Sequence, residues 1–461
     1  MMEGKIKIIM TDYIEKVKEK NKGQVLKYSI LTMGCQLNEN DSEKMAGMLE
    51  KMGYTETDDY KNADIVIFNT CCVRENAEER LFGKVGEIKN IKQNKDMILA
   101  IGGCMMQEKN MVDKIKKSYP FVDIIFGTHT MQNLPEYIYK TIIEKQKVRD
   151  VIDIDGKIYE GLPIKRMSEY KASVTIMYGC NNFCSFCIVP YVRGRERSRE
   201  PERILSEIKE LSEQGYKEIT LLGQNVNSYK GNDKIKNFAD LLNEVCKIEG
   251  IERVRFISPH PKDFTDDVIT AIAQNDKVCK IIHLPLQSGN TKVLKEMNRK
   301  YTKEQYLDLV DKMKEKIPNV VFSTDIIVGF PGETDEEFED TLDVVEKVNF
   351  EQAYMFIYSK RDGTVGAKRD DQIPEEIKHK RFEKLKNLYE SKVDLNNEKY
   401  INTIQKLLIE GKSKNNDEML EGRTDTNKVV VFEANKSYKP GDFVSVKILE
   451  AHKWYLKGEI I

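Results

Sequence analysis

The stretch Cys180-Asn181-Asn182-Phe183-Cys184-Ser185-Phe186-Cys187 places three thiols in a Cys-x3-Cys-x2-Cys spacing. It follows the apolar run 174–177, which predicts a strand that leads into a cysteine-bearing loop. Thiolates are soft ligands that favour zinc or iron–sulfur clusters over hard cations. A zinc site usually has a fourth ligand, and no Cys or His follows closely. A four-iron cubane on three thiolates keeps one iron open for a ligand, and the spacing favours this over a small zinc site or three unrelated buried thiols.

The composition limits the classes of protein to consider. The chain has 461 residues, enough for two or three domains, and its 74 Lys and Arg are balanced by 76 Asp and Glu. Because no overall basic charge indicates a nucleic-acid partner, any RNA contact must use local patches. No apolar run is long enough to predict a transmembrane helix. Residues 1–25 are mostly charged and are expected to form a flexible, partly helical leader rather than a signal peptide.

The nine cysteines indicate the cellular compartment. Without a secretion signal, they favour metal sites in a reducing cytosol over disulfides, so we expect a cytoplasmic protein. Two of them, Cys246 and Cys279, lie in apolar runs and are expected to be small buried hydrophobic residues.

Residues 26–144 alternate strand-like and helix-like runs, which predicts a doubly wound parallel sheet covered on both faces. The expected strands are 28–33, 64–69, 97–102 and 122–126, with helices starting near residues 42 and 75. Ligands of such sheets bind at the carboxyl ends of the strands. Cys35, Cys71 and Cys104 each follow one of these strands. Three thiols at equivalent positions favour a second three-thiolate cluster. The neighbouring Cys72 is expected to point away, and it stays open as the alternative ligand.

Residues 145–165 are expected to form a linker, with a strand or hairpin at 151–158 and a domain boundary near Arg166. Residues 166–397 then repeat the alternation and predict a partial (β/α)6 barrel of the TIM type, with its site at the carboxyl ends of the strands. The expected strands are 173–177, 218–222, 253–257, 280–284, 320–328 and 352–357. The cysteine stretch follows the first of them, which agrees with a site at that end of the barrel.

Residues 398–461 differ from the rest, because short β-type runs alternate with Asn, Gly and Pro turns. They predict a small antiparallel β-barrel of the OB-like kind, joined to the preceding barrel by a long charged helix over 375–400. Its nearly balanced charge does not by itself establish RNA binding. Arg423, Lys428 and Lys453 are the candidate RNA contacts, and packing against the central barrel is the alternative role of this domain.

Polar turns at the later strand ends predict a small-molecule pocket, with ordinary turn chemistry as the alternative. They are Leu222-Gly223-Gln224-Asn225, Leu286-Gln287-Ser288-Gly289 and Thr324-Asp325. His260 and His283 could act as acid–base groups but are expected to be structural. Residues 190–199 contain four arginines, which either contact phosphates or pair with Glu196, Glu200 and Glu202.

These motifs resemble a known family. The Cys180–Cys187 stretch resembles the signature of radical S-adenosylmethionine (SAM) enzymes. Gly34-Cys35-Gln36-Leu37-Asn38, Asn69-Thr70-Cys71 and Gly102-Gly103-Cys104 resemble the N-terminal domain of its methylthiotransferase family, and the last sixty or so residues resemble the TRAM domain, an RNA-binding barrel. Pro190-Tyr191-Val192-Arg193-Gly194 resembles a pattern of the tRNA-modifying branch. The Gly34–Asn38 motif, Leu222-Gly223-Gln224-Asn225-Val226-Asn227 and Gly422-Arg423-Thr424 look most like the branch that acts on N6-isopentenyladenosine. The resemblance runs in order from about residue 26 to the end.

The resemblance implies a transferase that adds a methylthio group to C2 of N6-isopentenyladenosine at position 37 of tRNA, beside the anticodon. It implies two 4Fe-4S clusters, held by Cys35, Cys71 and Cys104 and by Cys180, Cys184 and Cys187, with no catalytic residue beyond them. Two SAM molecules serve each turnover: one methylates a sulfur at the auxiliary cluster, and the other is cleaved to a 5′-deoxyadenosyl radical. The implied SAM contacts are Gly223, Gln224, Gln287, Ser288 and Asp325. The implied RNA contacts are Arg193, Arg195, Arg197 and Arg423.

The resemblance also implies an electron donor such as flavodoxin or ferredoxin, a monomer, and no membrane partner. Related methylthiotransferases act on threonylcarbamoyladenosine in tRNA or on an aspartate of a ribosomal protein, and both stay open as alternatives. A non-enzymatic iron–sulfur protein that binds RNA or senses redox state is an alternative of another class. It would hold clusters and form no 5′-deoxyadenosine from SAM.

Overall fold

The computed structural model describes residues 2–72, 76–151, 157–414, 416–433 and 438–461. The chain divides into two compact units. The first comprises the chain up to Met167 with Tyr178–Asn181 and Cys187–Arg197, and the second comprises Ser168–Met177, Asn182–Phe186 and Ser198–Ile461. The hairpin expected at 151–158 falls mainly outside the described residues. No helix in the described part of the chain has both the length and the apolarity to cross a membrane.

The first unit contains a six-stranded sheet in the order β2-β1-β3-β4-β5-β6, with every neighbouring pair parallel. Its strands are β1 (Leu26–Met33), β2 (Tyr54–Glu56), β3 (Ile65–Thr70), β4 (Ile98–Gly103), β5 (Ile124–Phe126) and β6 (Val148–Asp150). Alternate residues of β3 enter different cores: Ile65 and Ile67 one, Val66 and Phe68 the other. The expected doubly wound sheet is confirmed.

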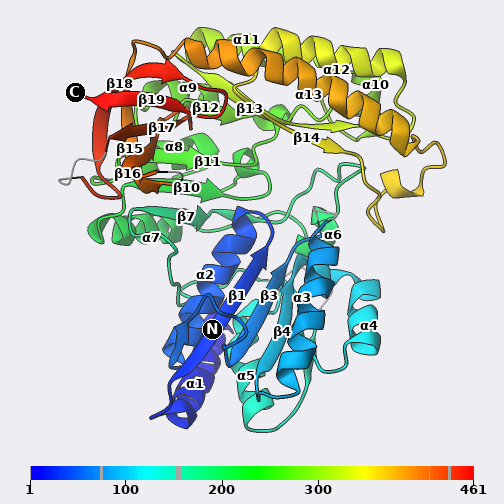
Figure 1. Cartoon of the computed structure of the whole chain (residues 1–461), viewed down its shortest axis with the longest axis vertical. Helices are drawn as coiled ribbons and strands as arrows, with labels where there is room; N and C mark the ends of the chain where they lie inside the picture. Colours follow the sequence, from blue (N-terminus) through cyan, green and yellow to red (C-terminus); the bar gives the residue numbers. More distant parts are fainter. Residues whose placement is uncertain (1, 73–75, 152–156, 415, 434–437) are drawn as a thin grey trace. The chain divides into compact units, whose positions relative to one another are not determined.

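Helices cover both faces of this sheet (Figure 1). One face packs on α1 (Met2–Asn21), α2 (Gln36–Lys51) and α5 (Leu134–Ile142), and the other on α3 (Asn76–Lys92) and α4 (Lys109–Ser118). Helix α2 begins directly after Cys35 and not near residue 42. The polar residues of its first turns obscured the helical pattern, because several of them are buried in hydrogen bonds described below.

The segment expected to be a flexible leader forms α1 over most of its length. Met10, Ile14 and Val17 are buried, and their spacing of four and three residues puts them on one helix face. The ring of Tyr13 lies 5.2 Å from that of Tyr139 in α5. The helix agrees with the partly helical character expected of this segment, although the charged composition hid its narrow apolar stripe.

The second unit contains six parallel strands in two sets, β11-β10-β7 and β12-β13-β14. These are β7 (Lys171–Thr175), β10 (Glu218–Leu222), β11 (Arg253–Phe256), β12 (Ile281–His283), β13 (Val321–Val328) and β14 (Gln352–Ile357). A parallel bridge between Val254 and Val278 joins the two sets just before β12. The result is the expected open (β/α)6 arrangement.

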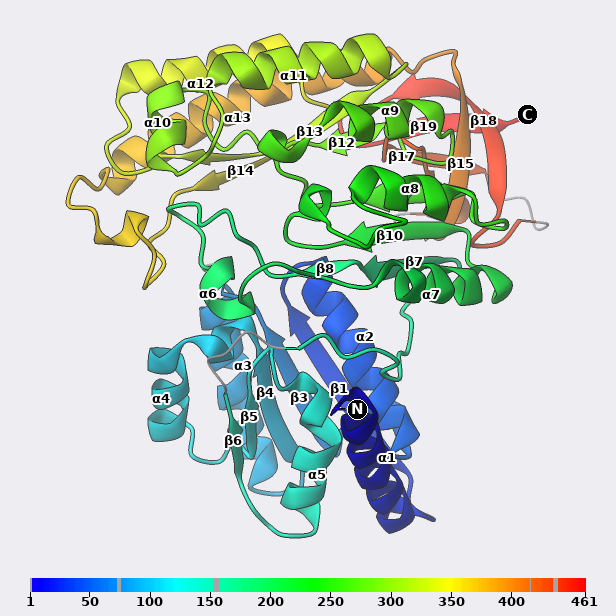
Figure 2. The same cartoon turned by 180° about the vertical axis from the view of Figure 1, so that it is seen from behind.

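The outer helices of this barrel pack their apolar stripes on the strands (Figure 2). They are α7 (Pro201–Glu213), α8 (Phe238–Cys246), α9 (Asp266–Gln274), α10 (Thr291–Glu296), α11 (Lys303–Lys316) and α12 (Asp335–Val348). Capping boxes formed by Thr302 with Gln305 and by Thr334 with Glu337 start α11 and α12. Helix α13 (Glu375–Glu398) follows and leads to the C-terminal barrel.

The C-terminal strands close into a barrel in the order β15-β16-β17-β19-β18. They are β15 (Ile404–Ser413), β16 (Asn416–Arg423), β17 (Val429–Glu433), β18 (Phe443–Ala451) and β19 (Leu456–Ile460). The pair β17–β19 is parallel, although the sequence predicted an antiparallel barrel. The reason is geometric, because a closed ring with an odd number of strands cannot alternate in direction at every step.

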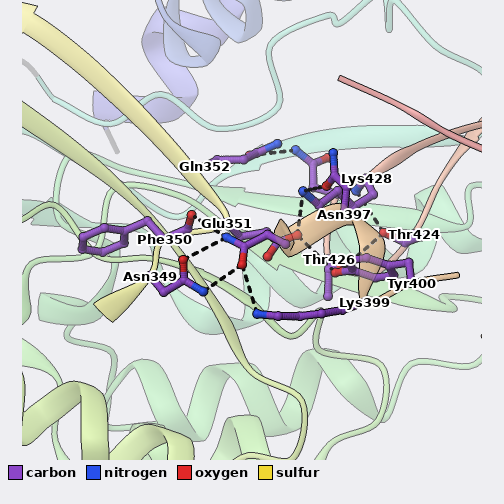
Figure 3. A network of polar contacts seen from close by, with 12 residues as sticks. Asn349, Phe350, Glu351, Gln352, Asn397, Lys399, Tyr400, Thr424, Thr426 and Lys428 are labelled. Atoms are coloured by element: carbon purple, nitrogen blue, oxygen red, sulfur yellow. Dashed lines mark hydrogen bonds and ion pairs between the residues drawn. The ribbon is translucent and has the colours of Figure 1, made fainter. Parts of the chain in front are cut away.

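A buried polar network docks this small barrel on the central one (Figure 3). The Lys428 ammonium lies 2.6 Å from a carboxylate oxygen of Glu351 and donates to Asn397 Oδ1 at 2.6 Å. The Tyr400 hydroxyl donates to Glu351 at 3.3 Å. The side chains of Lys428 and Glu351 are only 10% and 7% exposed. Lys428, a candidate RNA contact in the sequence, is therefore engaged in docking.

Two arginines of β11 add a second contact between the barrels. Arg253 donates to the carbonyl oxygens of Lys406 and Arg423, and Arg255 donates to those of Thr424 and Asp425. Because these acceptors are backbone groups, the contact depends on the path of the chain and not on the side chains of the small barrel.

We predict that Lys428→Met lowers the free energy of unfolding of the small barrel by about 3 kcal/mol, because it leaves the Glu351 carboxylate buried without its cation. Urea unfolding followed by the fluorescence of Trp454, the single tryptophan, measures this. The control is Lys457→Met, whose partner Glu450 is half exposed. It should change the value by no more than about 0.5 kcal/mol. Equal effects of the two substitutions would contradict a docking role for Lys428.

Candidate active site

Three cysteines leave the sheet of the first unit at one edge. In the parallel register, Met33 of β1 lies opposite Thr70 of β3, and Thr70 lies opposite Gly103 of β4. Cys71 and Cys104 come directly after these strand ends and Cys35 comes after Gly34, so the three strands that carry them end at the same edge of the sheet, as predicted. Cys35 is the N-cap of α2, and Cys104 opens the short helix η1 (Cys104–Gln107).

Two asparagines and a threonine tie the cysteine-bearing loops together. The Asn38 amide donates to Asn69 Oδ1 at 3.1 Å and to the Thr70 carbonyl at 3.2 Å, and the Asn69 amide donates to the Asn38 carbonyl at 2.7 Å. The Thr70 hydroxyl donates to the Gly102 carbonyl at 2.7 Å. All three side chains are buried. The sequence showed these residues beside the cysteines but gave no sign that they bond to one another.

Two glycines let the backbone close up at this edge. Gly103 has φ +99°, and a Cβ there would lie 2.4 Å from the carbonyl oxygen of Thr70. A Cβ on Gly102 would lie 2.2 Å from the ring of Phe126. No side chain fits at either position, so Cys104 is held close to the end of β3.

Cys72 lies beside Cys104 and does not point away as expected. Both thiols are buried and pack with Ile188 and Val192. The interaction with Cys72 and the charge of Arg193 lower the pKa of Cys104, although burial opposes the shift. The interaction with Cys104, together with burial, raises the pKa of Cys72.

This donor set fits an iron–sulfur cluster. Among the described residues, no three Cys, His, Asp or Glu side chains converge closely enough to hold a single metal ion. A four-iron cubane does not need three side chains to meet at one metal ion, because each of three thiolates binds a different iron. Three thiols at one edge, a close backbone approach and a buried cation beside Cys104 suit a bulky, anionic and soft group.

Of the other three cysteines, Cys180 and Cys187 belong to the first unit and Cys184 belongs to the second. In the first unit, the Cys180 amide donates to the Gly194 carbonyl at 3.1 Å. Gly179 has φ +76°, and a Cβ there would lie 2.0 Å from the Arg195 carbonyl oxygen. Only glycine permits this approach of the loop to residues 194–195.

In the second unit, the backbone around Cys184 is held in an uncommon conformation. Phe183 has φ +49°. The Asn298 amide donates to the carbonyls of Asn182 and Phe183 at 3.1 and 2.9 Å, and the Ser185 amide donates to the Met297 carbonyl at 2.9 Å. Strained backbone of this kind is maintained where the surroundings fix it, and it is frequent at functional sites.

A buried arginine contacts Cys184. Arg299 Nη1 lies 3.5 Å from its sulfur, while the rest of the guanidinium donates to the Tyr301 hydroxyl and the Pro285 carbonyl. Arg299 is 8% exposed. It lies 115 residues from Cys184 along the chain, so no local pattern could have identified it.

The five predicted SAM contacts have different surroundings, all in the second unit. Gly223 follows β10, and a Cβ there would lie 2.7 Å from Met177 Cγ. Gln287 has φ +68°, and its Oε1 is buried without a hydrogen-bond partner. Ser288 is fully buried and contacts the Thr341 hydroxyl. Gln224 is partly buried after β10.

The fifth predicted contact, Asp325, is paired with a histidine. His283 Nε2 lies 3.3 Å from the Asp325 carboxylate, and its Nδ1 lies 3.0 Å from the Ser323 hydroxyl. Burial lowers the pKa of the second histidine, His260, whose Nδ1 accepts from the Lys262 amide. Both histidines thus have the hydrogen-bonding partners of structural residues, as expected.

The predicted RNA contacts differ in their exposure and in their partners. Arg195 is exposed, and Arg197 is partly buried and donates to the Arg193 carbonyl. Arg423 pairs with Glu410 at 2.7 Å. Arg193 differs from them, because it is 6% exposed and donates to Cys104 and Asp41. A guanidinium enclosed in this way is not presented to a phosphate, so its surroundings do not favour the predicted RNA contact.

Comparisons with known proteins agree with this geometry. Residues 174–345 match the radical SAM superfamily, residues 27–127 match uncharacterized protein family UPF0004, and residues 398–461 match the TRAM domain. Among solved structures, the fold is similar to that of the radical SAM methyltransferase TsrM from Kitasatospora setae. That similarity has a TM-score of 0.55 and 16% identity, and it covers 75% of this chain and 77% of TsrM.

Curated relatives are much closer in sequence. The chain is 54% identical to a tRNA-2-methylthio-N6-dimethylallyladenosine synthase of Clostridium botulinum, over 94% of this chain and 97% of the relative. It is 52% identical to the synthase of that name from Acetivibrio thermocellus, over 97% of this chain and 95% of the relative. With its radical SAM, UPF0004 and TRAM regions in this order, the chain belongs to the radical SAM methylthiotransferase family, in the branch of the tRNA-2-methylthio-N6-dimethylallyladenosine synthases (MiaB).

Proposed function

We propose that this protein adds a methylthio group to C2 of N6-dimethylallyladenosine (N6-isopentenyladenosine) at position 37 of tRNA. The observation that carries the proposal is a second set of thiols, Cys35, Cys71 and Cys104, at one edge of a sheet that lies outside the radical SAM region. A radical SAM enzyme that only abstracts hydrogen needs only one set of cluster-binding thiols. The second set gives the reaction a place for sulfur, which accords with the name of the close relatives.

The chemistry accounts for the need for a radical. C2 of adenine is an unactivated aromatic carbon without an acidic proton, so polar substitution there is difficult. SAM bound at an iron–sulfur cluster supplies a carbon radical, and a second cluster supplies a sulfur that can carry the methyl group. The chain's part is to hold these groups, orient them and exclude water.

We assign the SAM-binding cluster to Cys180, Cys184 and Cys187, and the auxiliary cluster to Cys35, Cys71 and Cys104. Gln287 is the best-supported SAM contact, since its buried Oε1 has no hydrogen-bond partner among the described residues and can accept from an ammonium or a hydroxyl group. Ser288 and Asp325 already have protein partners, so a ligand would share them.

Within the first unit, one short helix connects residues of the two cysteine sets. Helix α6 (Val189–Arg193) begins almost directly after Cys187. Its neighbour Ile188 and its own Val192 are four residues apart, lie on one face, and pack on Cys72 and Cys104. Cys187 is therefore joined by a few residues to side chains that pack on Cys72 and Cys104.

A cavity of about 50 Å³ lies next to this helix in the first unit, and basic side chains predominate among its charged residues. Its lining includes Asp41, Lys44, Tyr178, Arg193 and Arg197. Cations and a tyrosine that line one cavity suit a nucleotide whose base has left its stack. Arg197, which lines this cavity, stays a proposed RNA contact, as do Arg195 and Arg423, which are not among its lining residues. A reducing cytosol, a flavodoxin or ferredoxin as electron donor and a monomeric enzyme belong to the same proposal.

The substrate is tested in tRNA from a strain that lacks this protein. Nucleoside mass spectrometry should show loss of 2-methylthio-N6-dimethylallyladenosine and accumulation of the precursor without the methylthio group. The wild-type chain should restore the product, and Cys184→Ala should not, because it removes a ligand of the proposed SAM-binding cluster. Unchanged product in the deletion strain would reject this substrate, and loss of the methylthio form of threonylcarbamoyladenosine instead would identify the other tRNA branch.

The ligand assignment is tested by a matched pair of variants. Cys71→Ala should lose about half of the iron bound by the reconstituted chain, while 5′-deoxyadenosine formation from SAM survives, because only one of the two clusters is affected. Cys72→Ala should keep nearly all of the iron. The reverse pattern would identify Cys72 as the ligand. If intact protein with both clusters forms no 5′-deoxyadenosine, the enzymatic proposal fails.

A further inference from the structure

Arg193 is a buried charge whose place in the fold differs from that of its neighbours in the arginine-rich segment. Its Nε donates to the sulfur of Cys104 at 3.1 Å, and its Nη2 donates to Asp41 Oδ2 at 2.9 Å. The side chain is 7% exposed, and that of Asp41 is 12% exposed. All three residues belong to the first unit. The guanidinium is thus fixed at both ends between α2 and η1.

This arrangement is specific to arginine. Its planar fork presents N–H groups in two directions at once, so one side can contact a sulfur while the other pairs with a carboxylate. A lysine has one point of charge on a flexible chain and cannot span both partners. The guanidinium of an arginine stays protonated throughout the working pH range, so this buried group carries a positive charge.

The position of Arg193 in the sequence adds a second observation. It is the last residue of α6, and Gly194 follows with φ +74° and ends the helix. The chain from Cys187 to Arg193 can span at most about 21 Å even if extended. One short segment therefore carries both a thiol of the radical SAM stretch and a cation that touches a thiol of the other set.

We propose that Arg193 is a positioning residue of the auxiliary site: it holds Cys104 in place and sets the reduction potential of the group that Cys104 binds. The inference rests on the proposed function, which assigns a cluster to Cys35, Cys71 and Cys104. A positive charge and an N–H donor beside a cluster ligand stabilise the reduced, more negative state and so raise the reduction potential. Asp41 orients the guanidinium, and its negative charge limits this effect.

The test uses full-length protein in which Cys180, Cys184 and Cys187 are all replaced by Ala, so that only the auxiliary thiols can bind a cluster. After anaerobic reconstitution, the iron content and the midpoint potential are measured, the latter by titration followed by electron paramagnetic resonance. Arg193→Gln should shift the midpoint potential to more negative values and speed the loss of iron to a chelator. The midpoint potential and the rate of iron loss of Arg193→Lys should lie between those of Arg193→Gln and of the parent protein. Lysine keeps the positive charge but lacks the planar guanidinium.

Two further variants separate the possible causes. Arg80→Gln, an exposed arginine on α3, is the matched control and should leave both quantities unchanged. If Arg193→Gln does not fold because Asp41 is left buried and unpaired, the double variant Asp41→Asn with Arg193→Gln removes both charges. The double variant should still shift the midpoint potential to more negative values, because the cation it removes contacts the sulfur directly. The shift should be smaller than in the single variant, because the negative charge of Asp41, which lies behind Arg193, is removed as well.

The outcomes are distinguishable. If the triple Ala background binds no cluster, the auxiliary cluster of the proposed function is rejected. If it binds a cluster whose potential is the same in every Arg193 variant, only the role of Arg193 is rejected. A raised KM for tRNA in the otherwise intact Arg193→Gln enzyme, with an unchanged potential, would also overturn this inference and return Arg193 to the RNA contacts.

Discussion

The parallel pairing of β1, β3 and β4 is the constraint on which the rest of this site depends. Parallel strands in register end at the same edge, so three cysteines placed after three strands must come together there. The hydrogen bonds among Asn38, Asn69 and Thr70 then fix the distances between the loops. The chain needs no contiguous cysteine motif in this domain, because the parallel sheet places the three cysteines at one edge.

Buried cations make several further contacts on which the structure depends. Arg193 contacts Cys104 in the first unit, and Arg299 contacts Cys184 in the second. Each thiol set thus has an arginine inside the protein, where a charge acts more strongly than in water. Lys428 plays a purely structural part, since its pairing with Glu351 docks the small barrel. The nearly neutral overall composition hides these local charges, so they could not be read from net charge.

Local patterns predicted the architecture well. The doubly wound sheet, the partial barrel and the small C-terminal β-barrel all follow from the alternation of apolar residues and from turn signals. The errors have identifiable causes. The buried stripe of helix α1 was missed because its three apolar residues, Met10, Ile14 and Val17, are scattered among charges. The start of α2 was placed too late because its first turns are rich in polar residues, several of which are buried.

The sequence by itself determined which residues can bind soft metals and in which fold elements they lie, because those properties depend on residue type and on short-range spacing. Only the tertiary structure decided which cysteines are neighbours, as Cys72 and Cys104 are. It also decided which arginines contact the thiols and which lie at the surface. Arg193 and Cys104 are 89 residues apart, and Arg299 and Cys184 are 115 apart. Contacts over such separations are set by how strands and helices pack, and no local pattern encodes them.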